Sequence, residues 1–166
     1  MFKFSRHGYV CLAVYCWLGV GHAADSVTIN LSGSVTMDSC KVTSPASQSL
    51  SWGAIAASTI TADAAAVKKA TIMIDCGAYS LPITTTLANS KGNFDASRGI
   101  LSSGLAGLGL KATWADDGSV IALSQTKTWG SRSGVRDFSI NFKPTSTGTV
   151  TTGVFNTVST LSIEYR

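Results

Sequence analysis

The sequence predicts an all-β domain built as an antiparallel β-sandwich. Most of the chain is rich in Thr, Ser, Val and Ile, with glycines at turn-like intervals. That composition favours strands and tight turns. Six to eight short alternating segments follow one another closely, without a repeated strand–helix pattern, as is typical of antiparallel sandwiches rather than parallel sheets.

Residues 1–23 have the features of a cleaved secretory signal peptide. A basic start precedes the apolar run 9–20, which is shorter than the roughly 20 residues needed to span a bilayer. Cleavage after Ala23 places small residues at both recognition positions, whereas cleavage after Ala24 would place His22 at one of them. We therefore predict export, with a mature chain that begins at residue 24.

Removing this segment changes the charge and the available chemistry. The net charge of +4 loses Lys3 and Arg6, which leaves +2, and the remaining basic residues are dispersed. We expect no binding to nucleic acid, because no basic cluster carries interleaved aromatic residues. Both histidines also leave with the signal peptide. Ser-His-Asp or Cys-His catalysis and histidine metal sites are thereby excluded, and we expect no enzyme and no cofactor.

Two cysteines remain in the mature chain, Cys40 and Cys76. An even cysteine count in an exported chain implies a disulfide, which would stabilise the fold by about 3–4 kcal/mol. Removing 23 of 166 residues leaves 143, enough for one core but not for two ordinary domains. The adjacent acids Asp116 and Asp117 precede Gly118, which favours a hairpin turn over an acid/base pair.

The expected strands follow in chain order. Residues 26–37 alternate apolar and polar side chains, and their apolar face consists of Val27, Ile29, Leu31, Gly33 and Val35. Residues 51–70 are alanine-rich and are expected to form a strand followed by a loop or short helix, with the helical turn in the stretch 62–70. Residues 69–77 form a compact apolar strand that carries the second cysteine, and residues 81–88 continue as a strand after a short turn.

A hairpin and a further strand come next. Residues 107–123 predict a strand to Trp114, a turn over 115–118 and a returning strand. Residues 136–144 alternate apolar and polar side chains until Pro144, which is expected to end the strand because proline lacks a backbone N–H.

Residues 153–166 form the last predicted strand, and its apolar face consists of Phe155, Leu161, Ile163 and Tyr165. Gly153 stands fourteen residues from the end of the chain, and Tyr165 is next to last. This combination resembles the C-terminal signature of chaperone–usher pilus subunits. The similarity extends to residues 24–42, 48–55, 70–77 and 104–123, which resemble the family's N-terminal extension, its next strand, its second-cysteine strand and a hairpin of minor subunits.

The resemblance implies an incomplete immunoglobulin-like sandwich that lacks its final strand. Residues 24–37 would be a donor strand and residues 38–166 the pilin domain. The donor residues would be Val27, Ile29, Leu31, Gly33 and Val35. Gly153, Phe155, Leu161, Ile163, Tyr165 and Arg166 would contact the periplasmic chaperone and then the next subunit. The implied route leads through the periplasm and an outer-membrane usher to a cell-surface fimbrium.

Several alternatives stay open at this stage. The hairpin segment favours a minor or linker subunit, although a major rod subunit shares these motifs. A single-domain adhesive subunit that binds a host glycan or protein would need exposed, clustered tryptophans among Trp52, Trp114 and Trp129. A third alternative is an unrelated secreted sandwich that is complete on its own.

Overall fold

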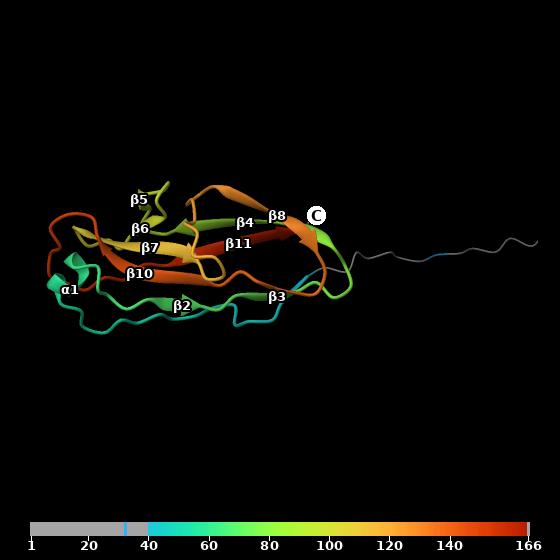
Figure 1. Ribbon diagram of the computed structural model, residues 1–166, viewed down its shortest axis with the longest axis horizontal. Helices are drawn as coiled ribbons and strands as arrows, with labels where there is room; N and C mark the ends of the chain where they lie inside the picture. Colours follow the sequence, from blue (N-terminus) through green and yellow to red (C-terminus); the bar gives the residue numbers. More distant parts are fainter. Residues whose placement is uncertain (1–31, 33–39, 166) are drawn as a thin grey trace, which may run out of the picture. The chain divides into compact units, whose positions relative to one another are not determined.

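The structure is a computed structural model that describes Ser32 and residues 40–165 (Figure 1). Residue contacts divide the chain into Met1–Val35 and Thr36–Arg166, and the second unit holds all described residues except Ser32. The predicted signal peptide, the five donor residues and Arg166 lie outside the described residues. Those assignments, and the domain boundary at residue 38, stay predictions.

The described chain consists of eleven short strands and one helix. In chain order they are β1 (Lys41–Val42), α1 (Ala57–Thr61), β2 (Lys68–Ala70), β3 (Met73–Asp75), β4 (Leu81–Asn89), β5 (Asn93–Asp95), β6 (Ile100–Ser102), β7 (Leu108–Trp114), β8 (Thr126–Arg132), β9 (Val135–Asp137), β10 (Ile140–Ser146) and β11 (Ser159–Tyr165). In this part of the chain, no helix is long and apolar enough to cross a membrane.

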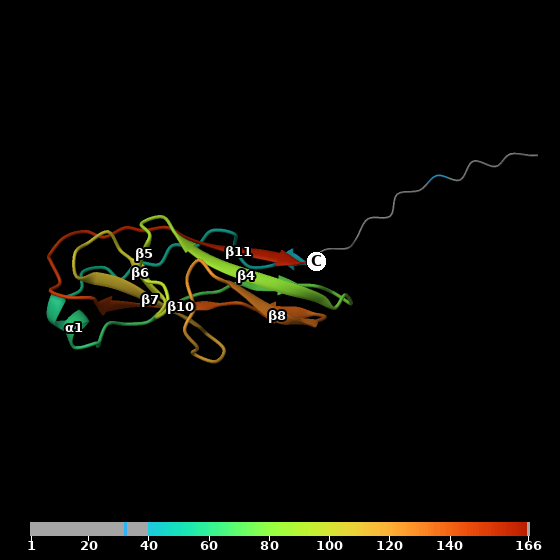
Figure 2. The same cartoon turned by 90° about the horizontal axis from the view of Figure 1, so that it is seen from above.

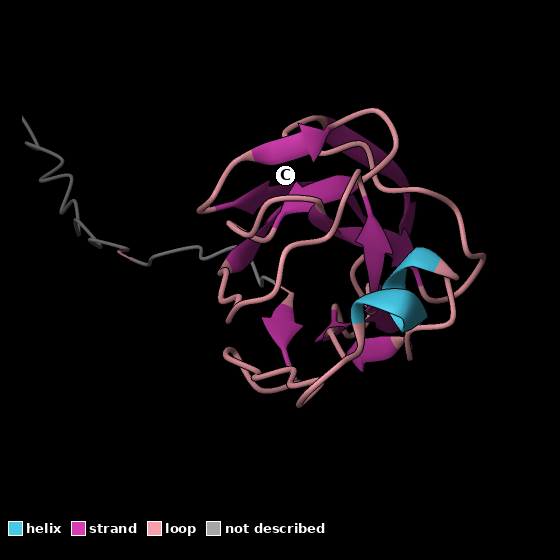
Figure 3. Cartoon of the chain, turned by 90° about the vertical axis from the view of Figure 1, so that its left-hand side faces the viewer, coloured by secondary structure: helices cyan, strands magenta, loops and turns pink. Residues whose placement is uncertain are grey.

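The strands form three sheets, with the orders β1-β3-β9, β2-β10-β7-β6-β5 and β11-β4-β8. Every strand pairing is antiparallel. Figure 2 shows β11, β4 and β8 side by side in that order. Figure 3 shows strands around the interior and α1 on the outside. The prediction of an all-β antiparallel fold is confirmed.

The core lies between the sheets and joins residues from all three. The β11-β4-β8 sheet contributes Ile83 and Leu87, the five-stranded sheet contributes Leu110 and Trp114, and β3 contributes Ile74. Interdigitation of two apolar sheet faces is how a sandwich excludes water.

The strand expected over residues 48–55 is wrong, because this segment has no ladder of backbone hydrogen bonds. Side chains attach it instead. The Gln48 amide donates to the Thr71 carbonyl oxygen at 2.6 Å and accepts from the Thr71 N–H at 3.0 Å. The Trp52 indole N–H donates to the Ala66 carbonyl oxygen at 2.8 Å. These bonds fix the segment beside residues 66–71 without making it a strand. A short helix is present in the alanine-rich segment as α1, but it ends at Thr61, before residues 62–70 where the helical turn was expected, and residues 68–70 form β2 instead.

The hairpin expected over 107–123 is only partly correct. Its first strand is β7, and the turn has Gly118 at φ 69°, a conformation that favours glycine. The return after the turn is a single bridge between Thr113 and Val120, not a strand. Asp117 accepts a hydrogen bond from the Ser119 N–H at 2.8 Å, which fits the turn interpretation of the acidic pair.

Three other boundaries differ from the sequence prediction. The strand expected over 69–77 is split into β2 and β3, and the strand expected over 136–144 is split into β9 and β10. Pro144 does not end β10, which continues to Ser146. Proline is tolerated there because β2 pairs only with residues 140–142, so one side of β10 has no ladder beyond them. β5, β6 and β8 were not predicted.

Candidate strand-docking edge

β11 is an edge strand with one free side. It pairs with β4 along its whole length, from Ser159 opposite Asn89 to Tyr165 opposite Ile83. No other strand among residues 40–165 pairs with it. An edge strand presents a row of backbone N–H and C=O groups to whatever lies beside it, so this edge is a template for one more strand.

The register shows which side chains of β11 face the interior. Leu161, Ile163 and Tyr165 lie opposite Leu87, Thr85 and Ile83 of β4. Directly opposed residues of antiparallel strands project from the same face of the sheet. The three β4 partners are 2 %, 2 % and 0 % exposed, so this face is the interior one.

The interior is covered beneath β4 but not beneath β11. Leu161 and Ile163 are only half-buried, although they pack against the core, and Tyr165 is 40 % exposed. Glu164, between the last two, lies opposite Thr84 and therefore faces outward. The inward face of β11 is thus an uncharged apolar stripe that is left incompletely covered.

A cavity of about 490 Å³ lies where the chain approaches β11. One wall is formed by residues 50–55 and the other by residues 150–155, with Leu105 and Leu108 between them. The rings of Trp52 and Phe155 meet across it, with centroids 6.1 Å apart. The cavity is large enough to accept several apolar side chains from an added segment.

Gly153 lines this cavity. A Cβ atom at that position would lie 2.9 Å from Cδ1 of Leu105, so a larger residue would displace the leucine side chain. The adjacent Val154 is 95 % exposed. The segment before β11 therefore offers both a recess and an uncovered apolar side chain.

Two polar residues next to the apolar stripe have an internal role. Thr157 and Ser159 both donate their hydroxyls to Oδ1 of Asn89, at 2.6 and 3.3 Å. The Asn89 amide nitrogen donates in turn to the carbonyl oxygens of Gly92 and Ser102, at 2.6 and 2.9 Å. These four bonds fix the start of β11 against the end of β4.

A disulfide joins Cys40 to Cys76. Both cysteines are buried and belong to the main core cluster. Cys40 immediately precedes β1 and Cys76 immediately follows β3, so the bond fixes the beginning of the described domain to the sheet. The predicted disulfide is confirmed.

The tryptophans do not form an open sugar-binding platform. Trp114 and Trp129 lie edge to face with centroids 4.9 Å apart, but Trp114 is only 2 % exposed. Trp52 packs on Phe155 rather than on that pair. Within residues 40–165, no three His, Cys, Asp or Glu residues lie together as a metal-binding group.

The structure brings together most of the predicted interface residues that it describes. Leu161, Ile163 and Tyr165 share the inward face of β11. Gly153 and Phe155 precede the strand and line the cavity instead of continuing the ladder, so the strand predicted over 153–166 begins six residues late. Sequence reasoning missed the opposite wall, which Leu50 and Trp52 help to form; their every-second-residue spacing was the available signal.

Comparisons with known proteins agree with this geometry. No protein-family model matches the sequence, and a search of the curated proteins found no significant match. Among solved structures, the chain is similar to the P pilus rod subunit PapA, with 17 % identity and a TM-score of 0.56, over 76 % of this chain and 99 % of that one. It is also similar to the subunit of a chaperone–usher pilus studied for rod uncoiling, with 16 % identity and a TM-score of 0.55, over 86 % and 96 % of the two chains. The chain therefore has the fold of chaperone–usher pilus subunits.

Proposed function

We propose that this protein is a structural subunit of a chaperone–usher fimbria that polymerises by donor-strand exchange and contributes to cell adhesion. The observation that carries the proposal is the β11 edge, where half-buried apolar side chains face an incompletely covered interior beside a free backbone ladder. Strand addition at such an edge is an established mode of recognition in chaperone–pilin complexes. The similarity of the fold to pilus subunits supports the same conclusion.

The donor would be the N-terminal segment of a neighbouring subunit, with residues 24–37 of this chain serving the next acceptor. Its apolar positions are Val27, Ile29, Leu31, Gly33 and Val35. Gly33 suits a place where the acceptor backbone comes close. Burial of four or five such side chains at about 1.5–3 kcal/mol each gives on the order of 10 kcal/mol, which the cost of ordering the strand reduces.

Before polymerisation, a periplasmic chaperone would occupy the same edge. Gly153, Phe155, Leu161, Ile163 and Tyr165 would contact its strand, and the carboxylate of Arg166 would pair with basic chaperone residues. An outer-membrane usher would then exchange the chaperone for the donor strand of the next subunit. The assembled fimbrium would lie on the cell surface.

Within the fibre, we assign this chain to a minor or linker position. The support is the similarity of residues 104–123 to the hairpin segment of minor subunits. Immunogold labelling of isolated fibres tests the assignment. Sparse label at tips or joints is expected, and continuous label along the shaft would indicate a rod subunit instead.

Expression in a periplasm tests the main proposal. The chain from residue 24 onward should aggregate or be degraded when produced alone, because its apolar stripe is left uncovered. It should become soluble with a cognate pilus chaperone, or when a peptide that copies residues 24–37 is supplied during refolding. A stable soluble monomer of residues 38–166 without chaperone or peptide would overturn the proposal.

A further inference from the structure

The β11-β4-β8 sheet has two edges, and β8 is the second one. Among the described residues, β8 pairs with β4 and with no strand beyond it. A subunit that recruits a strand at β11 therefore carries another edge in the same sheet that could recruit one. Strand addition at both edges would branch or aggregate a fibre.

The two edges differ in the residues that face the interior. Thr85 of β4 is flanked by Ile163 of β11 on one side and by Lys127 of β8 on the other. Thr85 is buried, and directly opposed residues share a face, so both flanking side chains point inward. The same row of the sheet thus places isoleucine at one edge and lysine at the other.

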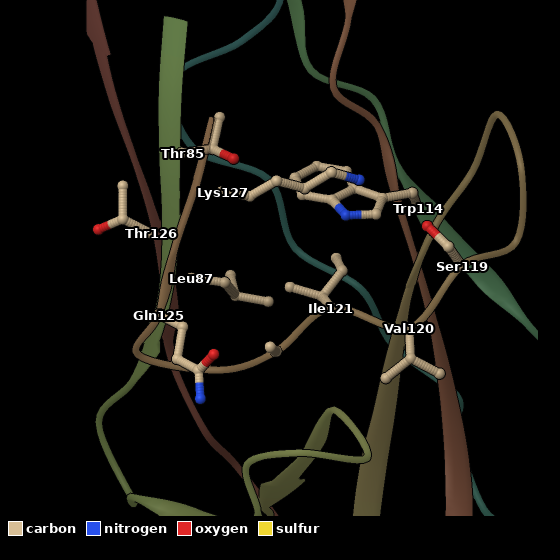
Figure 4. A pocket seen from close by; sticks show the side chains of 10 residues that line it. Thr85, Leu87, Trp114, Ser119, Val120, Ile121, Gln125, Thr126 and Lys127 are labelled. Carbon is tan, nitrogen blue, oxygen red and sulfur yellow. The ribbon is translucent and has the colours of Figure 1, made fainter. Parts of the chain in front are cut away.

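Lys127 is held in this inward orientation by two aromatic rings. Its Nζ lies 4.0 Å from the ring centroid of Trp129 and 5.2 Å from that of Trp114, both within the range of cation–π attraction. The Trp129 indole N–H donates to Oγ1 of Thr85 at 2.8 Å, which fixes the ring beneath the ammonium group. Figure 4 shows the Lys127 side chain extended beside the Trp114 ring.

A cavity of about 420 Å³ opens beneath this edge, and Lys127, Trp114, Leu87 and Ile121 help to line it (Figure 4). The Trp114 indole N–H is buried and has no hydrogen-bond partner among the described residues. Water in the cavity can satisfy this donor and the ammonium group. An apolar side chain from an added strand would leave both without partners, which is costly.

The backbone of β8 is also partly occupied. Nη1 of Arg136 donates to the Gly130 carbonyl oxygen at 2.9 Å, which takes up an acceptor of the edge strand. With Arg132 at the end of β8, three cationic side chains lie along or beside this strand. Inward-pointing and edge charges are known means by which sheet proteins block strand addition.

We propose that Lys127 closes the β8 edge to apolar strands and thereby confines strand addition to β11. The inference rests on the proposed function, because it concerns where the donor strand docks. It makes Lys127 a specificity-determining residue, and the unpartnered Trp114 indole N–H in the cavity beneath it supports the assignment. The edge at which the donor strand docks would then depend on the two residues opposite Thr85. Ile163 at the β11 edge allows an apolar strand to bind, and Lys127 at the β8 edge prevents it.

The test uses the chaperone-bound subunit and a peptide that copies residues 24–37 and carries a photo-crosslinker at position 31. In the wild-type chain, crosslinks should map to β11, with only a weak background at β8. Lys127→Ile should raise β8 crosslinks about tenfold, a ratio that corresponds to ~1.4 kcal/mol. Lys127→Arg should behave like the wild type because it keeps the charge. Thr128→Ile, which adds an apolar side chain to the outward face of the same strand, should also keep β8 labelling at the wild-type level.

A second variant keeps the test valid if isoleucine disturbs folding. Lys127→Met retains the unbranched stem and the packing on both rings, so it should fold and should also gain β8 crosslinks. Unchanged β8 labelling in both Lys127→Ile and Lys127→Met would overturn the role of Lys127. Absence of β11 labelling in the wild type would instead overturn the proposed function. The two outcomes can be told apart because labelling at β11 and labelling at β8 are measured separately.

Discussion

At the scale of single residues, the Asn89 side chain fixes the start of β11 through four hydrogen bonds. Its side-chain amide uses both oxygen and nitrogen to join Thr157 and Ser159 to the carbonyl oxygens of Gly92 and Ser102. In the sequence, the two hydroxyl residues interrupt the apolar stripe. The structure gives them a purpose that periodicity cannot reveal, because their partner lies 68 and 70 residues away.

Asn89→Ala should therefore destabilise the subunit. It leaves two carbonyl oxygens and two hydroxyls without their partner, and each lost bond in a partly buried site costs about 0.5–1.5 kcal/mol. Urea denaturation of the subunit–peptide complex measures the loss, with exposed Asn156→Ala as the control. Equal midpoints for the two variants would show that the Asn89 bonds contribute nothing.

Tyr165 and Glu164 offer a matched pair at the end of β11. Tyr165 faces the interior and is 40 % exposed, whereas Glu164 faces outward opposite Thr84. Tyr165→Ser should weaken binding of the chaperone about tenfold or more, because an aromatic surface that the donor covers is lost. Glu164→Ser should have little effect. Titration calorimetry against purified chaperone compares them, and equal affinities would remove the inward face of β11 from the interface.

At the scale of elements, alternation predicted the strands whose inward residues are apolar, and failed where polar groups replace them. The segments predicted over 81–88 and 107–114 form β4 and β7, in which buried Ile83, Leu87, Leu110 and Ala112 alternate with more exposed residues. β8 was missed because a lysine, Lys127, and not an apolar residue, lies opposite the buried Thr85. The segment 48–55 has strand-like periodicity but forms no strand. The Gln48 side-chain amide bonds the backbone N–H and C=O of Thr71, which a neighbouring strand would otherwise pair with.

The disulfide is the element-scale constraint that the sequence predicted correctly. It closes a loop with a sequence separation of 36 between the first described residue of the domain and the end of β3. Replacing Cys40 and Cys76 together with serine should lower the free energy of unfolding by about 3–4 kcal/mol in the chain-entropy description. Denaturation of the peptide complex measures this change. A loss well below 1 kcal/mol would mean that the ladder between β1 and β3 alone fixes this end of the sheet.

At the scale of the whole molecule, one sheet has β11 and β8 as its two edges on opposite sides of β4, and we propose that only β11 accepts a donor strand. The fold class and the C-terminal stripe could be predicted from the sequence, because both depend on local composition and periodicity. The incompletely covered interior and the contrast between Ile163 and Lys127 could not. They depend on which strands become neighbours, and β8 lies more than thirty residues from its partner β4 in the sequence.

This asymmetry predicts a specific pattern of amide hydrogen exchange. Alternate N–H groups of an antiparallel edge strand point away from its partner and exchange readily until another strand covers them. The N–H groups of β11 that point away from β4 should be protected in the chaperone complex, and also in the complex with a peptide that copies residues 24–37. In each complex a donor strand covers them. The N–H groups of β8 that point away from β4 should exchange rapidly in both complexes. Protection that appears along β8 and not along β11 would place the donor strand at the wrong edge and would contradict the assignment of β11 as the site of polymerisation.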